Sequence, residues 1–169
     1  MLVSLRDCRH SKKDQQWIES VYGEYLDALA DLNTGFFPVM GGDNARKEEI
    51  FASWFASDRS HPLLILQELV PVGFALVSRS NIPGATPAVD FRMAEFFVRK
   101  PHRQSGIGRE AATLIFDRFA GEWEILEYLR NPGAVAFWRR VITGYCGNNF
   151  TERTQSGEVR QRFKSRKAK

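Results

Sequence analysis

Apolar residues in the first third of the chain recur every three or four positions, which is the spacing of amphipathic helices. The first predicted helix begins after Ser11 as its N-cap and ends at Asn33-Thr34-Gly35. A second helix is capped by Asp43 or Asn44. The apolar positions of the first helix are Ile18, Val21, Tyr22, Tyr25, Leu29 and Leu32, and those of the second are Ile50, Phe51, Trp54 and Phe55.

The pattern then changes to the short apolar runs that are typical of strands. Leu63–Leu66 and Val72–Val77, joined by a turn that contains Pro71, predict a β-hairpin. Asn81–Pro87 is rich in Pro and Gly and predicts a loop. Phe91–Val98 predicts a further strand, and Leu2–Leu5 predicts a short edge strand before the first helix.

The second half of the chain alternates helices with strands. One helix is expected to end at Gly121, and a later one begins at Asn131-Pro132, with Asn as N-cap and Pro first, and closes at Gly144. Their apolar positions are Ile107, Ala111, Leu114, Ile115 and Phe119, and Val135, Trp138, Val141 and Ile142. The predicted strands are Trp123–Leu129, Tyr145–Thr151 and Val159–Phe163.

This order of elements predicts a single α/β domain over residues 1–169. Its core is a mixed, mostly antiparallel β-sheet with helices on both faces. The strand that ends at Val98 and the strand that begins at Trp123 flank a helix, so a right-handed crossover should make them parallel. We find no internal repeat and no linker that divides the chain.

Charge and composition narrow the choice of partner and location. The formal net charge of +4 and the pI of about 9.3 favour an anionic partner, which nucleic acid, a membrane surface or a phosphorylated cofactor would each supply. The N-terminus lacks the apolar core of a signal peptide, and no apolar run reaches the ~20 residues that span a bilayer. We therefore expect a cytoplasmic protein without a membrane partner. Cys8 and Cys146 are far apart and predict two reduced thiols rather than a disulfide or a metal site.

The end of the chain is basic. Its cations are Arg160, Arg162, Lys164, Arg166, Lys167 and Lys169. Because the first of these alternate with Val159, Gln161 and Phe163, the pattern favours a final strand with a solvated face and a frayed end over nucleic-acid binding.

The glycine-containing turn after the strand Phe91–Val98 is the strongest candidate for chemistry. It contains Arg103, Gln104, Ser105, Gly106, Ile107 and Gly108, and Arg109 follows. A turn that opens a helix points backbone N–H groups outward at the positive end of the helix dipole, where an anion binds. Glycines let a phosphate approach the backbone, and the two arginines add positive charge. The spacing matches neither GxGxxG nor GxxxxGK[ST], so by physics alone a phosphate site and a plain connection are equally supported.

The segment from Phe96 to Gly108 resembles motif A of the GNAT superfamily of N-acetyltransferases, whose core is Q/R-x-x-G-x-G/A. The positions that match the core are Arg103, Gly106 and Gly108. The superfamily's N-x-x-A-x-x-F pattern on the next helix is matched by Asn131, Ala134 and Phe137. The predicted order of elements also matches that fold, so the resemblance covers most of the chain.

The resemblance implies acetyl-CoA as co-substrate. It implies that backbone N–H groups from Gln104 to Arg109 bind the pyrophosphate. It also implies that the backbone of Phe97 and Val98 pairs with the pantetheine arm between two splayed strands. Asn131 would hydrogen-bond the arm and Phe137 would pack against it; the alternative roles are a helix cap and plain core.

The catalytic assignments follow from the need to deprotonate an amine, whose pKa is near ~10. Glu95, on the strand before the turn, is the first candidate for the base, ahead of Glu127 and Asp90, and an ion-paired or solvated carboxylate is the alternative for each. Many relatives have, at the position of Trp138, a tyrosine that protonates the departing CoA thiolate. Tyr145 or Tyr128 then becomes the candidate acid, unless the thiol leaves without one.

Together, these expectations predict an N-acetyltransferase that transfers an acetyl group from acetyl-CoA to a primary amine. A small-molecule amine is the first candidate. Aromatic residues of the first two helices and their connection would line the acceptor pocket, or form plain core: Tyr22, Phe36, Phe37, Trp54 and Phe55. The alternatives are a protein N-acetyltransferase and a non-catalytic acyl-CoA-binding regulatory module. Relatives are often dimers, and a homodimer stays open here.

Overall fold

The computed structural model describes residues 1–31, 44–80 and 88–167. The expected helix stop at Asn33-Thr34-Gly35, the loop Asn81–Pro87 and the two aromatic residues Phe36 and Phe37 lie outside these ranges. Within them, the elements follow the predicted order. They are β1 (Val3–Asp7), α1 (Lys12–Asp31), α3 (Asn44–Ala56), β2 (Ser60–Gln67), β3 (Val70–Arg79), β4 (Phe91–Val98), α4 (Ile107–Arg118), β5 (Glu122–Tyr128), α5 (Pro132–Cys146), β6 (Phe150–Gln155) and β7 (Glu158–Lys164).

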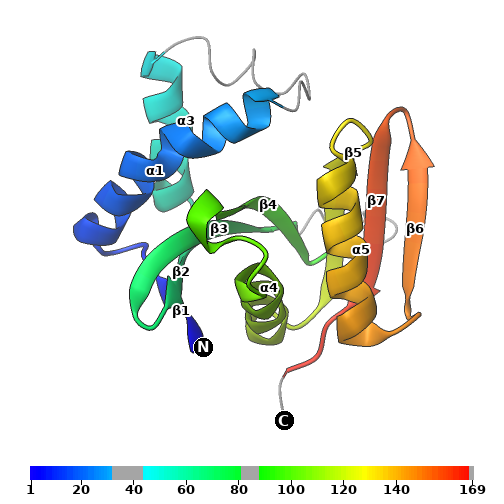
Figure 1. The fold of residues 1–169 in the computed structure, drawn as a ribbon. Coiled ribbons are helices and arrows are strands. Elements are labelled where there is room, and N and C mark those ends of the chain that lie inside the picture. Colours follow the sequence, from blue (N-terminus) through cyan, green and yellow to red (C-terminus); the bar gives the residue numbers. More distant parts are fainter. Residues whose placement is uncertain (32–43, 81–87, 168–169) are drawn as a thin grey trace.

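The strands form one seven-stranded sheet in the order β1-β2-β3-β4-β5-β7-β6. Every neighbouring pair is antiparallel except β4 and β5, which are parallel as the crossover through α4 requires. The mixed, mostly antiparallel sheet is therefore confirmed. Figure 1 shows α1 and α3 together on one side of the sheet, with α4 and α5 on the other.

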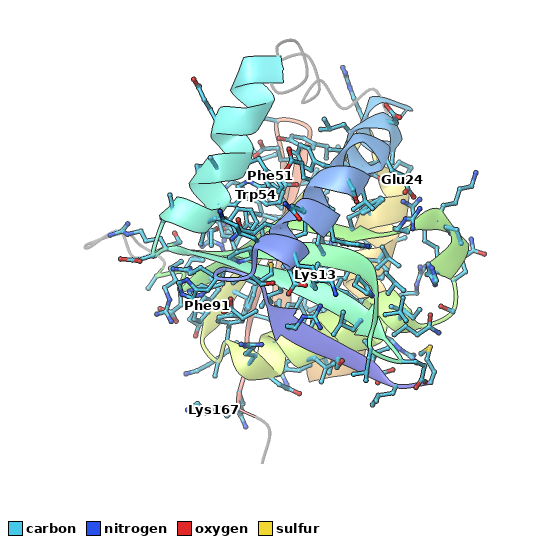
Figure 2. The ribbon with its side chains drawn as sticks, turned by 90° about the vertical axis from the view of Figure 1, so that its left-hand side faces the viewer. Lys13, Glu24, Phe51, Trp54, Phe91 and Lys167 are labelled. Carbon is cyan, nitrogen blue, oxygen red and sulfur yellow. The ribbon has the colours of Figure 1, made fainter. Side chains whose placement is uncertain are left out.

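Each face of the sheet has its own apolar core. On the α1 and α3 side, Trp54 packs edge-on against Tyr22, with ring centroids 5.5 Å apart, and both rings rest on Phe74 of β3. Figure 2 shows Phe51 and Trp54 on α3, in the layer shared with α1. On the other side, Phe116 of α4 lies among aromatic rings of β5, β7 and α5. The helical stripes seen in the sequence thus become the two covers of the sheet.

The end of α5 differs from the prediction. The expected strand Tyr145–Thr151 is wrong at its start, because α5 continues through Gly144 and Tyr145 to Cys146, and β6 begins at Phe150. Gly147, with a φ of 65°, is the residue that ends the helix, and its N–H donates to the Thr143 carbonyl. A glycine at positive φ stops a helix, whereas Gly144 has ordinary helical geometry and does not.

Candidate active site

The site is built around a gap between β4 and β5. These strands pair only at Phe91 with Trp123 and at Arg92 with Glu124. From Met93 to Val98, β4 keeps its pairing with β3 on one edge but forms no pair with β5 on the other. The backbone of β4 therefore presents an unpaired edge, which is what an extended ligand needs in order to add to a sheet.

A β-bulge decides which side chains of β4 face which side of the sheet. The β3–β4 register shifts between Met93 and Glu95, opposite Leu76 and Val77. A bulge inserts one residue and so reverses the alternation beyond it. Phe91 and Met93 consequently pack toward α4 and α5, while Glu95 and Phe97 face α1.

At the point where the strands separate lies a cavity of about 320 Å³. Its walls come from α1, β3, β4, β5 and α5, and include Tyr25, Ser78, Arg92, Glu95, Phe96, Glu127, Tyr128, Asn131 and Trp138. The cavity thus reaches both faces of the sheet through the gap. Two of the acids predicted from the sequence, Glu95 and Glu127, line this cavity.

Glu95 is buried, with 8% of its surface exposed. The hydroxyl of Tyr25 on α1 donates a hydrogen bond to its Oε2. Burial raises the pKa of the Glu95 carboxyl to about 8. Burial, and then the charge of Glu95, raises the pKa of the neighbouring Tyr22 to about 12. Among the described residues, Tyr25 is the donor that positions Glu95, and a carboxyl with a pKa raised toward neutral suits a general base.

Glu127 on β5 is also buried, with 4% exposed. Neither of its carboxyl oxygens has a hydrogen-bond partner in the part of the chain that the structure describes. Burial, and then the charge of Glu152, raises its pKa to about 8 against the opposing effects of the Arg139 charge and of its own backbone N–H, which lies near the carboxyl but makes no well-formed hydrogen bond with it. The third candidate, Asp90, lies elsewhere: its Oδ2 accepts a 2.9 Å hydrogen bond from the Glu122 N–H at the start of β5.

The turn after β4 has the backbone form of an anion site. Gly106 is the N-cap of α4 with a φ of 88°, and Gln104 also has a positive φ of 61°. Glu110 donates the first intrahelical bond, to the Gly106 carbonyl at 3.0 Å. Across the described residues, the backbone N–H groups from Gln104 to Arg109 have no partner. They are therefore available to a phosphate at the positive end of α4.

Arg103 joins this turn to the end of β4. Its Nε donates a 2.7 Å hydrogen bond to the Val98 carbonyl, and its guanidinium lies over the Phe97 ring, 5.3 Å from the centroid. Arg103 and Arg109 are both exposed, so their remaining N–H groups are accessible to an anion. The N–H turn therefore comes directly after the part of β4 that has no partner in β5.

The comparisons agree with this geometry. Residues 26–142 match the model of the acetyltransferase (GNAT) family. The chain belongs to this family. A comparison with curated proteins finds no match. The superfamily resemblance inferred from the glycine turn is confirmed, and acetyl transfer is the chemistry of the family.

Solved structures share the fold of this GNAT chain at low identity. An acetyltransferase from Thermus thermophilus is 17% identical with a TM-score of 0.63, covering 96% of each chain. A spermidine N-acetyltransferase from Vibrio cholerae, in complex with CoA and spermine, is 11% identical with a TM-score of 0.62, covering 95% of this chain and 93% of that one. A PaiA N-acetyltransferase from Thermoplasma acidophilum, in complex with coenzyme A, is 12% identical with a TM-score of 0.58, covering 97% and 99%.

The start of α5 brings the family's second motif to the cavity. Asn131 is the N-cap: its Oδ1 accepts a 3.0 Å hydrogen bond from the Ala134 N–H. The cap role therefore holds, and the Asn131 amide N–H₂ remains as a donor in the cavity wall. Phe137 packs between Gly108 and Phe96, and a Cβ on Gly108 would come within 3.3 Å of the Phe137 ring. Gly108 thus serves close packing between α4 and α5.

The structure does not bring Tyr145 to the cavity. Its hydroxyl donates to Asp117 Oδ1 at 2.8 Å and lies 3.2 Å from the Arg166 carbonyl. Burial and the Asp117 hydrogen bond raise its pKa to about 12. Tyr128, the other hydroxyl considered, does line the cavity, as does Trp138. Tyr145 is therefore engaged in joining α5 to α4 and the end of β7.

Sequence reasoning assigned Tyr25 only to the apolar stripe of the first helix. Its hydroxyl partner lies 70 positions away on β4, and the bulge that turns Glu95 toward α1 has no signature in the local pattern.

Two further findings concern membrane-spanning helices and metal-binding clusters. Within residues 1–31, 44–80 and 88–167, no helix is long and apolar enough to cross a membrane. In the same ranges, no three His, Cys, Asp or Glu side chains gather where they would hold a metal ion.

Proposed function

We propose that this chain transfers the acetyl group of acetyl-CoA to the primary amine of a small molecule. The observation that carries the proposal is the position of Glu95. Its buried carboxyl accepts a hydrogen bond from Tyr25 and lies in the wall of the cavity where β4 and β5 separate. If the phosphates of acetyl-CoA bound at the start of α4, the thioester would lie next to this base.

Each part of coenzyme A has a counterpart in the chain. The N–H groups from Gln104 to Arg109 bind the pyrophosphate, with Arg103 and Arg109 adding charge. The β4 edge at Phe97 and Val98 that faces away from β3 pairs with the pantetheine arm. Because Arg103 already occupies the Val98 carbonyl, the pairing falls on the other polar groups of this edge. The Asn131 amide donates to the arm, and the Phe137 ring packs beside it.

Glu95 performs the first proton transfer. An alkylammonium with a pKa near ~10 is attracted by the Glu95 carboxylate and gives up its proton to it. The freed nitrogen attacks the thioester carbonyl. The adduct then loses the second nitrogen proton to water and collapses, and the carbon–sulfur bond breaks to give the amide and the CoA thiolate. The backbone N–H groups on the bare edge of β4 are the donors available to the developing oxyanion.

The cavity supports a small acceptor. Its volume of about 320 Å³ is at the lower end of the range of small-molecule sites, and Tyr25, Phe96 and Trp138 supply aromatic walls. The Vibrio cholerae structure of the same fold holds spermine, which is a small polyamine. We therefore place polyamines and other alkyl amines first among the acceptors.

One observation favours a second function. Trp138 stands where relatives have a tyrosine, and an indole N–H is no useful acid. A chain that binds acyl-CoA without turning it over would act as a regulatory module.

The deciding experiment measures release of CoA thiol from acetyl-CoA with a panel of polyamines, amino acids, aminoglycosides and a lysine peptide. We expect turnover with at least one alkyl amine, reduced about 100-fold or more in Glu95→Gln. Asp90→Asn is the control, since its side chain outside the cavity keeps its hydrogen-bond acceptor, and it should retain activity. CoA binding without turnover on any amine would support the regulatory module instead.

A further inference from the structure

The geometry points to Glu127 as the acid that protonates the departing sulfur of coenzyme A. This inference rests on the proposed acetyl transfer and adds a second catalytic residue to it. It follows from where Glu127 lies, from the state of its carboxyl, and from what the reaction needs on that side of the gap.

The two acids of the cavity belong to opposite faces of the sheet. Side chains alternate along β5, and Trp123 and Ile125 pack against α5, so Glu127 lies on the α5 side as well. Glu95 faces α1 on the other side. An arm held by phosphates at the start of α4 approaches from the α4 and α5 side. The sulfur then lies nearer Glu127, and the amine nearer Glu95.

The surroundings of Glu127 favour a protonated carboxyl. The cation whose charge reaches it, Arg139, is already paired with Glu152 through both Nε and Nη2. Gln161 on β7 also donates its amide to Glu152, at 2.9 Å. An unpaired carboxylate in such a buried place costs much more free energy than the neutral acid does.

A second buried oxygen supports the same state. Gln161 Oε1 has no hydrogen-bond partner among the described residues either. Its strand position is opposite Ile125, so Gln161 is the diagonal neighbour of Glu127 on the same face. A proton on the Glu127 carboxyl would provide a hydrogen-bond donor beside this buried, unpaired Gln161 oxygen, which favours the protonated state. Among the described residues, the other charged ones in the cavity wall are Glu95 and the Arg92–Glu124 pair.

The proton balance closes over one cycle. As the adduct collapses, the electron pair of the carbon–sulfur bond goes to sulfur, and sulfur takes the proton of Glu127. The adduct nitrogen still carries one proton too many and loses it to water as the amide forms. The Glu127 carboxylate is reprotonated from water and Glu95 releases to water the proton it took from the amine, so each turnover of an ammonium substrate releases one proton. A thiol of pKa near ~8.5 and a carboxyl whose pKa is raised to about 8 are well matched, so the transfer is nearly level in free energy.

The first test is Glu127→Gln, which keeps the shape and removes the proton. We expect kcat to fall about 100-fold and to lose the decline that the wild type shows as the pH rises through about 8. An unchanged kcat, or a rise in the KM for the amine alone, would overturn the inference and make Glu127 a structural or amine-binding residue.

The second test needs no turnover. Titration of the thiol of bound coenzyme A, followed by the ultraviolet absorbance of the thiolate, should give a pKa that is lower in Glu127→Gln than in the wild type, by about one unit. The reason is that the wild-type carboxylate repels the thiolate. Equal thiol pKa values would show that Glu127 is not near the sulfur.

Glu152→Gln is the matched variant on the same polar cluster. Its side chain is not part of the cavity wall, and removing its charge should lower the pKa of Glu127, so the alkaline decline of kcat moves to lower pH while kcat on the plateau is kept. This variant also tests the inference if Glu127→Gln does not fold: an unmoved decline would count against it. Failure of the wild type to bind coenzyme A would instead contradict the proposed function.

Discussion

At the scale of single residues, Glu95 depends on its hydrogen bond from Tyr25. Tyr25→Phe removes the donor that stabilises the carboxylate, so the pKa of Glu95 should rise further and the acid side of the kcat/KM profile should move up by about one pH unit. The pH profile of acetyl transfer measures this. Tyr22→Phe is the control, since the Tyr22 ring packs beside Tyr25 at a tilt of 48°, and it should leave the profile in place. A profile that moves in Tyr22→Phe and not in Tyr25→Phe would refute this role of Tyr25.

The residues of the site were predictable to different degrees. The glycine turn and Glu95 stand beside a recognisable motif, and both reach the gap. Glu127 was the weaker candidate because Glu95, and not Glu127, lies on the strand just before the glycine turn; the burial of Glu127 appears only in the folded chain. Tyr145 was a candidate acid because Trp138 stands where many relatives have a tyrosine, whereas its place in the last turn of α5 directs its hydroxyl to Asp117.

At the scale of elements, the position of β4 depends on a close approach to β3. A Cβ on Gly73 would lie 2.2 Å from the Phe97 carbonyl oxygen, so only glycine permits this register. Gly73→Ala should therefore destabilise the protein by about 2 kcal/mol and weaken coenzyme A binding, because Phe97 and Val98 must shift. Urea unfolding measures the first effect. Unchanged stability and CoA affinity would show that β4 tolerates the shift.

Element order was predictable from hydrophobic period, and the details that make the site were not. The alternation in Phe91–Val98 places Glu95 with Phe91 and Met93, and the bulge reverses this. The gap beside β4 was expected only through the family resemblance, because strand separation depends on pairing partners distant in sequence. The end of α5 was missed because a glycine stops a helix only where its φ is positive.

At the scale of the whole molecule, the two buried acids make folding depend on pH. Each has a pKa near 8 in the folded state against the ordinary 4.5, so the folded chain holds more protons between these values. Stability should consequently fall as the pH rises from about 4.5 to about 8. The double variant Glu95→Gln, Glu127→Gln should gain about 2–4 kcal/mol over the wild type at pH 8.5 and little at pH 5. Urea unfolding at both values tests this, and a gain that does not depend on pH would contradict the burial argument.

The measurement closest to the centre of the account is calorimetric titration of coenzyme A into the wild type and two alanine variants. Gly106→Ala places a Cβ where φ is 88°, which distorts the N–H turn, while Gly23→Ala lies in α1 with no atom within 4 Å of the new Cβ. The account predicts saturable binding to the wild type, affinity about tenfold weaker or worse in Gly106→Ala, and unchanged affinity in Gly23→Ala. No binding to the folded wild type, or equal affinity in all three proteins, would contradict it.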